Sequence, residues 1–129
     1  MRVIFMGTPE FATPSLNCLI HSEHQVVAVY TRPDKMVGRD RGLVFSPVKK
    51  AASGYGLPLF QPSSLKHPEE VKRLVELGPD IIVVAAFGQI LSQDILNIPP
   101  FGCINVHPSL LPRHRGPSPI SAAILASDD

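Results

Sequence analysis

Runs of apolar residues recur along the chain and predict its β-strands. Four runs rich in β-branched residues cover Arg2–Met6, Val26–Thr31, Ile81–Ala86 and Cys103–His107, and Leu57–Phe60 is a shorter candidate. Their apolarity is continuous rather than alternating, which is typical of strands buried on both faces of a parallel sheet.

Signals for helix starts lie between these runs. Thr8, Pro9 and Glu10 offer an N-cap, a first-turn proline and an acid, and predict a helix to about Ile20. The same logic predicts helices that begin at Ser46-Pro47, at Pro68 (ending at Gly78-Pro79) and at Ser118-Pro119, and a short helix before Cys103. The polar, glycine-containing segment Arg32–Phe45 predicts a long exposed loop rather than a helix or strand.

Strands and helices therefore alternate along one domain. This order predicts an α/β fold: a Rossmann-like, doubly wound, mainly parallel sheet of about five strands with helices on both faces. Ligands of such sheets bind at the carboxyl ends of the strands.

Composition narrows the functional class. The chain has 129 residues, 44% of them hydrophobic, and a formal net charge of +1, which is typical of a soluble globular domain and argues against a domain-wide nucleic-acid surface. Cys18 and Cys103 fit no metal-binding spacing and predict buried thiols in a reducing compartment. No apolar run reaches the ~18 residues of a membrane span, so we expect a cytoplasmic monomer without a metal.

The turn after the first strand run argues against a nicotinamide cofactor. A dinucleotide fingerprint needs three glycines, but Met6–Glu10 contains only Gly7. Pro9 also removes a backbone donor, and Glu10 places negative charge near the anion site.

Asn105 and His107 are the candidate catalytic residues. Two positions apart at the end of a buried strand that Pro108 terminates, they leave the same face at the carboxyl edge of the sheet. An amide and an imidazole together can donate to one oxygen and move one proton, which suits acyl transfer. The residues alone also fit a satisfied polar pair at a strand end.

A family resemblance adds to this reasoning. The run NVHPSLLPRHRG, from Asn105 to Gly116, resembles the shared motif of the folate-dependent formyltransferases. The GTPEFA opening at Gly7, the TRPD run at Thr31, the SPVK run at Ser46 and the GLPLFQP run at Gly56 are similar to the methionyl-tRNA formyltransferases, over essentially the whole chain.

The resemblance implies a reaction. The formyl group of 10-formyltetrahydrofolate would pass to the α-amino group of methionine on initiator tRNA. Asn105 would hold the formyl oxygen, and His107 would polarise the carbonyl and manage protons. The family's third catalytic residue is an aspartate further along than this chain extends. We therefore expect an N-terminal domain that is incomplete at its C-terminal end and nearly inactive alone.

Two segments are expected to contact the folate. The resemblance places them in the loop after the third long strand run and in the loop after the catalytic histidine. Apolar walls and backbone groups there would suit a flat pterin, although Ile90 and Leu111 also fit simple core positions. The expected folate-binding residues are Phe87, Gly88, Gln89, Ile90, Leu91, Ser109, Leu110, Leu111 and Pro112.

Five basic residues gather around one loop: Arg32, Lys35, Arg39, Arg41 and Lys49. Composition alone fits a solvated face, whereas phosphate contact requires local positive charge of this kind. The resemblance implies that the loop approaches the tRNA acceptor stem, with Arg39 and Arg41 as the expected tRNA-binding residues.

Other functions share parts of the pattern. The HxSLLP run of this chain also resembles that of three other enzyme families. These are the glycinamide ribonucleotide formyltransferases, the UDP-sugar amine formyltransferases and the formyltetrahydrofolate hydrolase domains. The hydrolase domains lack the asparagine that Asn105 provides. From a different class, the chain could be a non-catalytic folate- or nucleotide-binding module.

Overall fold

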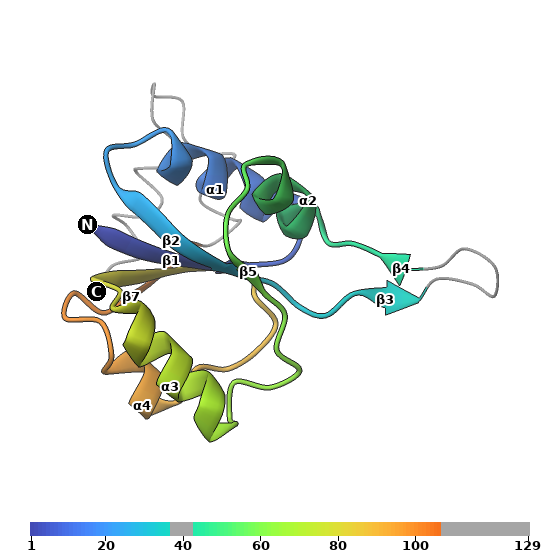
Figure 1. Cartoon of the computed structure of the whole chain (residues 1–129). Coiled ribbons are helices and arrows are strands. Elements are labelled where there is room, and N and C mark those ends of the chain that lie inside the picture. Colours follow the sequence, from blue (N-terminus) through green and yellow to red (C-terminus); the bar gives the residue numbers. More distant parts are fainter. Residues whose placement is uncertain (37–42, 107–129) are drawn as a thin grey trace.

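A five-stranded parallel sheet forms the centre of the molecule (Figure 1). The computed structural model describes residues 1–36 and 43–106. The strand order across the sheet is β5-β2-β1-β6-β7, and every pair of neighbours is parallel. The strands are β1 (Arg2–Gly7), β2 (Gln25–Tyr30), β5 (Leu59–Phe60), β6 (Ile81–Ala85) and β7 (Cys103–Asn105).

Helices cover both faces of this sheet. The helices α1 (Thr13–Ile20) and α2 (Pro47–Gly54) lie on one face, and α3 (Pro68–Leu77) and α4 (Gln93–Leu96) lie on the other (Figure 1). The doubly wound architecture predicted from the alternation of runs is thereby confirmed.

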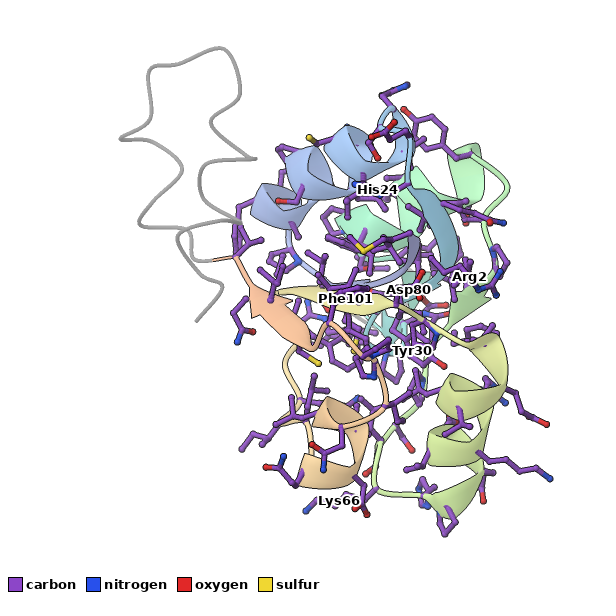
Figure 2. All side chains as sticks on the ribbon, turned by 90° about the vertical axis from the view of Figure 1, so that its left-hand side faces the viewer. Arg2, His24, Tyr30, Lys66, Asp80 and Phe101 are labelled. Carbon is purple, nitrogen blue, oxygen red and sulfur yellow. The ribbon has the colours of Figure 1, made fainter. Side chains whose placement is uncertain are left out.

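The hydrophobic core is divided by the sheet into two halves. In β1, Val3 and Phe5 belong to the half under α1 and α2, whereas Ile4 and Met6 belong to the half under α3 and α4. All four are at most 1% exposed, which is why the run is apolar without alternation. Figure 2 shows side chains filling the space on both sides of the strands.

The strand order reverses between β1 and β6. Gly7 ends β1 here, and a Cβ on it would lie 2.9 Å from the carbonyl oxygen of Ala85 and 2.9 Å from the Phe5 ring. Glycine is therefore required for the close approach of β1, β6 and the following turn. In open α/β sheets this switch point is where ligands bind.

The prediction that Thr8 caps a helix running to Ile20 was wrong. The chain instead forms a 3₁₀ turn, η1 (Glu10–Ala12), with Pro9 at its N-cap position and no side-chain cap, and α1 begins at Thr13. The Thr8 oxygen is not available for capping because it already accepts from the Arg32 backbone N–H and the Thr31 hydroxyl.

The prediction that Arg32–Phe45 is only a loop was also wrong. It contains a small antiparallel ladder between β3 (Lys35–Met36) and β4 (Leu43–Val44). Strands of two residues are too short to show a hydrophobic period against the polar residues around them.

The other helix signals gave mixed outcomes. Ser46 caps α2 by accepting from the backbone N–H of Lys49 at 3.0 Å, and Gly78 ends α3 in the left-handed region at φ 61°. The short helix before Cys103 is α4. The helix predicted at Ser118-Pro119 lies outside the described residues.

Both cysteines are half-buried free thiols. Cys103 packs against the core half under α3 and α4, whereas Cys18 lies on α1, which covers the opposite face. The sheet therefore separates the two sulfurs. Within residues 1–36 and 43–106, no helix combines the length and apolarity needed to cross a membrane.

Candidate functional site

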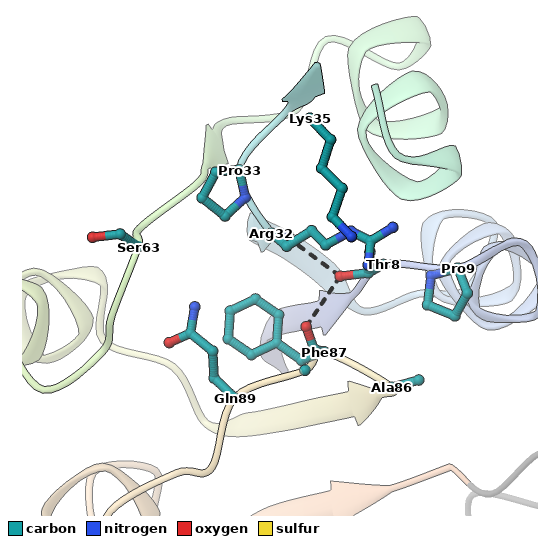
Figure 3. Close-up of a pocket in the computed structure, with 10 residues that line it drawn as sticks. Thr8, Pro9, Arg32, Pro33, Lys35, Ser63, Ala86, Phe87 and Gln89 are labelled. Carbon is teal, nitrogen blue, oxygen red and sulfur yellow. Dashed lines mark hydrogen bonds between the residues drawn. The ribbon is translucent and has the colours of Figure 1, made fainter. Parts of the chain in front are cut away.

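A cleft of about 440 Å³ opens at the carboxyl ends of β2, β1 and β6 (Figure 3). Thr8 follows β1, Arg32 and Lys35 follow β2, and Ala86–Gln89 follow β6; Ser63 comes from the segment after β5. These residues are brought together by the parallel sheet, because its strands end at one edge. The cleft thus occupies the switch point of the fold.

Thr8 is the central polar residue of the cleft floor. Its hydroxyl donates to the Phe87 carbonyl oxygen at 3.1 Å and accepts from the Arg32 backbone N–H at 3.3 Å (Figure 3). It also accepts from the Thr31 hydroxyl at 3.4 Å. One buried hydroxyl therefore joins the segments that follow β1, β2 and β6.

The hydrogen bonds continue behind Thr8 to α2. The Thr31 and Ser46 hydroxyls lie 2.7 Å apart, and Ser46 accepts from the Lys49 backbone N–H. Either hydroxyl fits as the donor of this 2.7 Å bond. All three hydroxyls are buried and all three have partners, which gives the cleft floor a defined geometry.

The turn after β6 has an unusual backbone. Ala86 has φ 56° and Gly88 has φ 95°, with Phe87 between them. An alanine in the left-handed region costs roughly 1–2 kcal/mol, and such strain is often found at functional sites. The turn exposes Ala86 and Gly88, buries the Phe87 ring at 1% exposure, and points the Phe87 carbonyl at Thr8.

Gln89 holds a neighbouring loop. Its Oε1 accepts from the Leu65 backbone N–H at 2.9 Å, and its Nε2 donates to the Pro62 carbonyl oxygen at 3.0 Å. Beyond it, Ile90 is 92% exposed, so it is not a core residue, and Leu91 packs partly against the core under α3. Of the folate-binding residues predicted in this loop, Phe87, Gly88 and Gln89 line the cleft.

Asn105 lies where the sequence placed it, at the carboxyl end of β7. It pairs with Val84 of β6 and is exposed, whereas its neighbours Ile104 and Val106 are buried in the core under α1 and α2. Its side chain thus leaves the opposite face, one strand away from the turn that lines the cleft. His107 and the predicted folate residues Ser109, Leu110, Leu111 and Pro112 lie outside the described residues.

The basic residues fall into three groups. Arg32 and Lys35 line the cleft. Lys49 was counted with the exposed basic charges, but this was wrong: its Nζ lies 2.7 Å from the Asp34 carboxylate, and both side chains are less than 20% exposed. Arg39 and Arg41 lie outside the described residues.

Asp34 is held by two donors. Lys49 donates to Oδ2, and the Gln61 side chain donates to Oδ1 at 2.7 Å. The bond from Lys49, followed by that from Gln61, holds the pKa of Asp34 below its ordinary value of 3.8. The carboxylate consequently stays ionised and committed to these partners at neutral pH.

Several of these site residues were not predicted from the sequence. Thr8, Thr31 and Ser46 were interpreted as strand or helix-cap residues, and Gln61 was not singled out. One signal could have found the first two: each is a hydroxyl residue at the end of a buried strand, where the switch point was expected.

Comparisons with known proteins identify the relatives of this chain. A family model described as "Formyl transferase" matches residues 1–129. Relatives called methionyl-tRNA formyltransferase include those of Methylococcus capsulatus, 58% identical over 128 residues, and Magnetococcus marinus, 54% identical over 127 residues. These matches cover 99% and 98% of this chain but 42% and 41% of the relatives, so the chain spans about two fifths of their length.

Solved structures agree on the fold. The phosphoribosylglycinamide formyltransferases of Bacillus halodurans and Anaplasma phagocytophilum superimpose with TM-scores of 0.62 and 0.59. Each is 22% identical, each match covers 98% of this chain, and they cover 66% and 58% of the two solved chains. At this identity the likeness concerns the fold alone.

Proposed function

Because this chain belongs to the formyl transferase family, whose model matches residues 1–129, we propose that it takes part in formylation of an amine. The donor is 10-formyltetrahydrofolate, and the acceptor is the α-amino group of methionine carried by initiator tRNA. The choice of acceptor rests on the relatives called methionyl-tRNA formyltransferase at 50–58% identity.

The observation that carries the proposal is the position of Asn105. Its exposed amide stands at the carboxyl end of β7, beside the β6 turn whose residues line the cleft. When the amine attacks the formyl carbon, negative charge develops on the formyl oxygen. An amide N–H directed at that oxygen stabilises the tetrahedral intermediate.

The remaining steps are assigned by residue type. The bond between the formyl carbon and N10 of the folate breaks, N10 gains a proton, and the attacking nitrogen loses one. His107, two residues beyond Asn105, is proposed to carry protons in this exchange, since an imidazole titrates near neutral pH.

The proposed folate site combines two loops. Ile90 is an apolar side chain at 92% exposure next to the cleft-lining turn, so a pterin ring lying over it would remove apolar surface from water. Ser109, Leu110, Leu111 and Pro112 are proposed to close the other side, on the strength of the family motif.

The proposed RNA contact involves the segment between β3 and β4. Arg39 and Arg41 belong to it in sequence, and this ladder extends away from the main sheet (Figure 1). Translation initiation takes place in the cytoplasm, which is where we propose that the protein acts.

The decisive experiment is a chimera. Residues 1–129 replace the matching segment of the Methylococcus capsulatus relative, and formylation of charged initiator tRNA is measured. We expect activity comparable with that of the relative, and a loss of about 10²–10³ in kcat for Asn105→Ala because one oxyanion donor is removed. An Asn105→Ala chimera within tenfold of the parent would contradict the assigned role.

Two controls define the reaction further. The 129-residue chain alone is expected to be at least ~10²-fold slower than the chimera, because it spans about two fifths of the relatives' length. Glycinamide ribonucleotide and a UDP-amino sugar are offered as competing acceptors. Faster formylation of either one would favour that branch of the family, and folate binding without turnover in the chimera would favour a binding module.

A further inference from the structure

Two residues flank the ladder of β3 and β4 and join it to the rest of the domain. Asp34 directly precedes β3, and Phe45 directly follows β4. The ladder extends away from the main sheet (Figure 1), and residues 35–44 are here called the arm. The contacts of Asp34 and Phe45 therefore set the direction in which the arm leaves the domain.

One lysine of α2 contacts both of these ends. The Nζ atom of Lys49 lies 2.7 Å from the Asp34 carboxylate and 3.8 Å from the centroid of the Phe45 ring. A cation over an aromatic face is attracted to it, and a partly buried ion pair is screened less by salt than an exposed one. Phe45 is 43% exposed, so burial alone does not hold its ring in place. Lys49, Asp34 and Phe45 are here called the clamp, because one side chain holds both ends of the arm against α2.

Further hydrogen bonds fix the same two ends. The Gln61 side chain, from the segment after β5, donates to Oδ1 of Asp34 at 2.7 Å and to the Arg32 carbonyl oxygen at 3.2 Å. On the other side, the hydroxyl of Ser46 lies 2.7 Å from that of Thr31. The arm is therefore joined to α2 and to the segment after β5 by polar contacts at its base.

The charge of Lys49 is used inside the protein. Its ammonium group is bound to Asp34 and lies over Phe45, so it is a poor ligand for an external phosphate. Arg39 and Arg41, the proposed RNA contacts, belong to the arm in sequence. Cationic side chains bind phosphates more tightly when the segment that carries them is already positioned, because less ordering entropy is lost on binding.

We propose that Asp34 and Lys49 are positioning residues for the acceptor RNA: they hold the arm in the direction in which it meets the RNA, and they do not touch the RNA themselves. The inference rests on the proposed function, which supplies both the RNA and the role of the arm in binding it. Its consequence is that the carboxylate of Asp34, although negatively charged, strengthens the binding of a polyanion.

The sign of one substitution tests this proposal. Fluorescein-labelled initiator tRNA is titrated with the chimera by anisotropy, without folate. Asp34→Asn removes a negative charge, so charge alone would tighten RNA binding. The clamp predicts the opposite: asparagine has one acceptor oxygen, so Lys49 or Gln61 loses its partner. We expect affinity to fall about threefold to tenfold, because the arm must then be ordered on binding.

Glu23→Gln is the matched control for this charge. Glu23 is exposed and precedes β2, whereas the arm follows β2, so the two lie at opposite edges of the sheet. The control also removes one negative charge, and it should bind tRNA within about twofold of the parent because a distant exposed charge is screened by salt.

Variants of Lys49 show whether the two residues act as a pair. Lys49→Met breaks both contacts of the clamp and should also weaken binding. The double variant Asp34→Asn/Lys49→Met should lose no more affinity than the weaker-binding single variant, because both changes break the same clamp. Lys49→Arg keeps a cation that can pair with a carboxylate and lie over a ring, and it should bind within about twofold of the parent. If Lys49 bound phosphate directly, Asp34→Asn would release it and tighten binding.

Hydrogen exchange follows the arm without RNA. In the same chimera, Asp34→Asn and Lys49→Met should speed amide exchange more in β3 and β4 than in β1 and β6, because the change is local. Tighter or unchanged tRNA binding by Asp34→Asn, additive losses in the double variant, or equal acceleration of exchange in all four strands would each overturn the proposal.

The outcome is separable from catalysis. If the chimera binds tRNA with the expected pattern but formylates no acceptor, the clamp stands and the proposed function falls. If the chimera formylates tRNA while Asp34→Asn binds it as the parent does, the clamp falls and the proposed function stands. A chimera that fails to bind tRNA overturns both.

Discussion

The Thr8 hydroxyl donates to the carbonyl oxygen of Phe87, 79 residues further along the chain and 3.1 Å away. This bond connects the end of β1 to the turn after β6, across the switch point of the sheet. The Phe87 carbonyl is oriented by the left-handed backbone at Ala86. The strained turn and the buried hydroxyl therefore form one unit that shapes the cleft.

Replacing Thr8 with valine should destabilise the fold. Valine keeps the shape but removes a donor to Phe87 and an acceptor for Thr31 and Arg32, and it leaves buried polar groups unpaired. We expect a loss of about 2–3 kcal/mol in the free energy of unfolding, measured with urea. Thr8→Ser keeps the hydroxyl and should lose no more than about 1 kcal/mol, the value of a buried methyl group.

Thr13→Val is the matched control for this pair. The Thr13 hydroxyl also donates to a backbone carbonyl, that of Glu10, but in a more exposed setting. Its loss should change stability by no more than ~0.5 kcal/mol. Equal losses of unfolding free energy at Thr8 and Thr13 would show that the buried hydrogen bonds of Thr8 contribute no more to stability than an exposed one.

The ion pair of Asp34 predicts a pH dependence. The folded protein holds the pKa of Asp34 below 3.8, chiefly through the bond from Lys49, so the ionised carboxylate stabilises the fold above that pH. Its contribution is lost as the pH falls through the lowered pKa. Asp34→Asn should therefore be less stable than the unaltered chain at neutral pH, and the difference should shrink below pH 3.8.

Urea midpoints across this pH range measure the effect. Glu23→Gln, at an exposed position, serves as the control for removing one negative charge. A stability difference for Asp34→Asn that stays constant as the carboxylate titrates would mean that the bonds to Lys49 and Gln61 do not depend on its charge.

The strands could be predicted because each is buried on both faces. Strand β1 could be predicted without knowing which elements pack against it, because Val3 to Met6 are all apolar whichever half of the core they face. Helix starts were less certain, and Thr8 and Ser46 show why. Both are hydroxyl residues followed by proline, yet Ser46 caps α2 and Thr8 does not, because the Thr8 oxygen accepts from Thr31 and Arg32, 23 and 24 residues further along the chain. A local motif cannot report a competitor far along the chain.

The candidate site shows the same division. The position of Asn105 could be predicted, because the end of its strand can be recognised from the local sequence. The ion pair of Lys49 with Asp34, 15 positions apart, could not be predicted in this way. The same holds for the bonds from Gln89 to Leu65 and Pro62, which are 24 and 27 positions away. The left-handed Ala86 was also unforeseen, since glycine is the usual residue there.

Charge reversal at Arg39 or Arg41 should impair use of tRNA. In the chimera, Arg39→Glu or Arg41→Glu is expected to raise KM for charged tRNA about tenfold and leave KM for the folate nearly unchanged. Each lost phosphate contact should flatten the salt dependence of binding by roughly 0.7–0.9 in log–log slope. Lys72→Glu on α3 is the control. An equal fall in folate affinity would mean that the segment has a structural role instead.

Substitution by alanine is expected to have opposite effects on stability at Gly7 and at Gly54. A Cβ at Gly7 would meet the Ala85 carbonyl oxygen and the Phe5 ring, each at 2.9 Å, and backbone atoms in a sheet cannot move aside easily. Gly7→Ala should lose about 1–3 kcal/mol of unfolding free energy, as expected for overpacking. At Gly54, the last residue of α2, nothing lies within 4 Å of the added Cβ. Gly54→Ala should therefore gain about 0.4–1 kcal/mol, because it restricts the unfolded chain without strain. Urea unfolding of the two variants side by side provides the measurement, and a stable Gly7→Ala would show that β1 and β6 can separate at the switch point without cost.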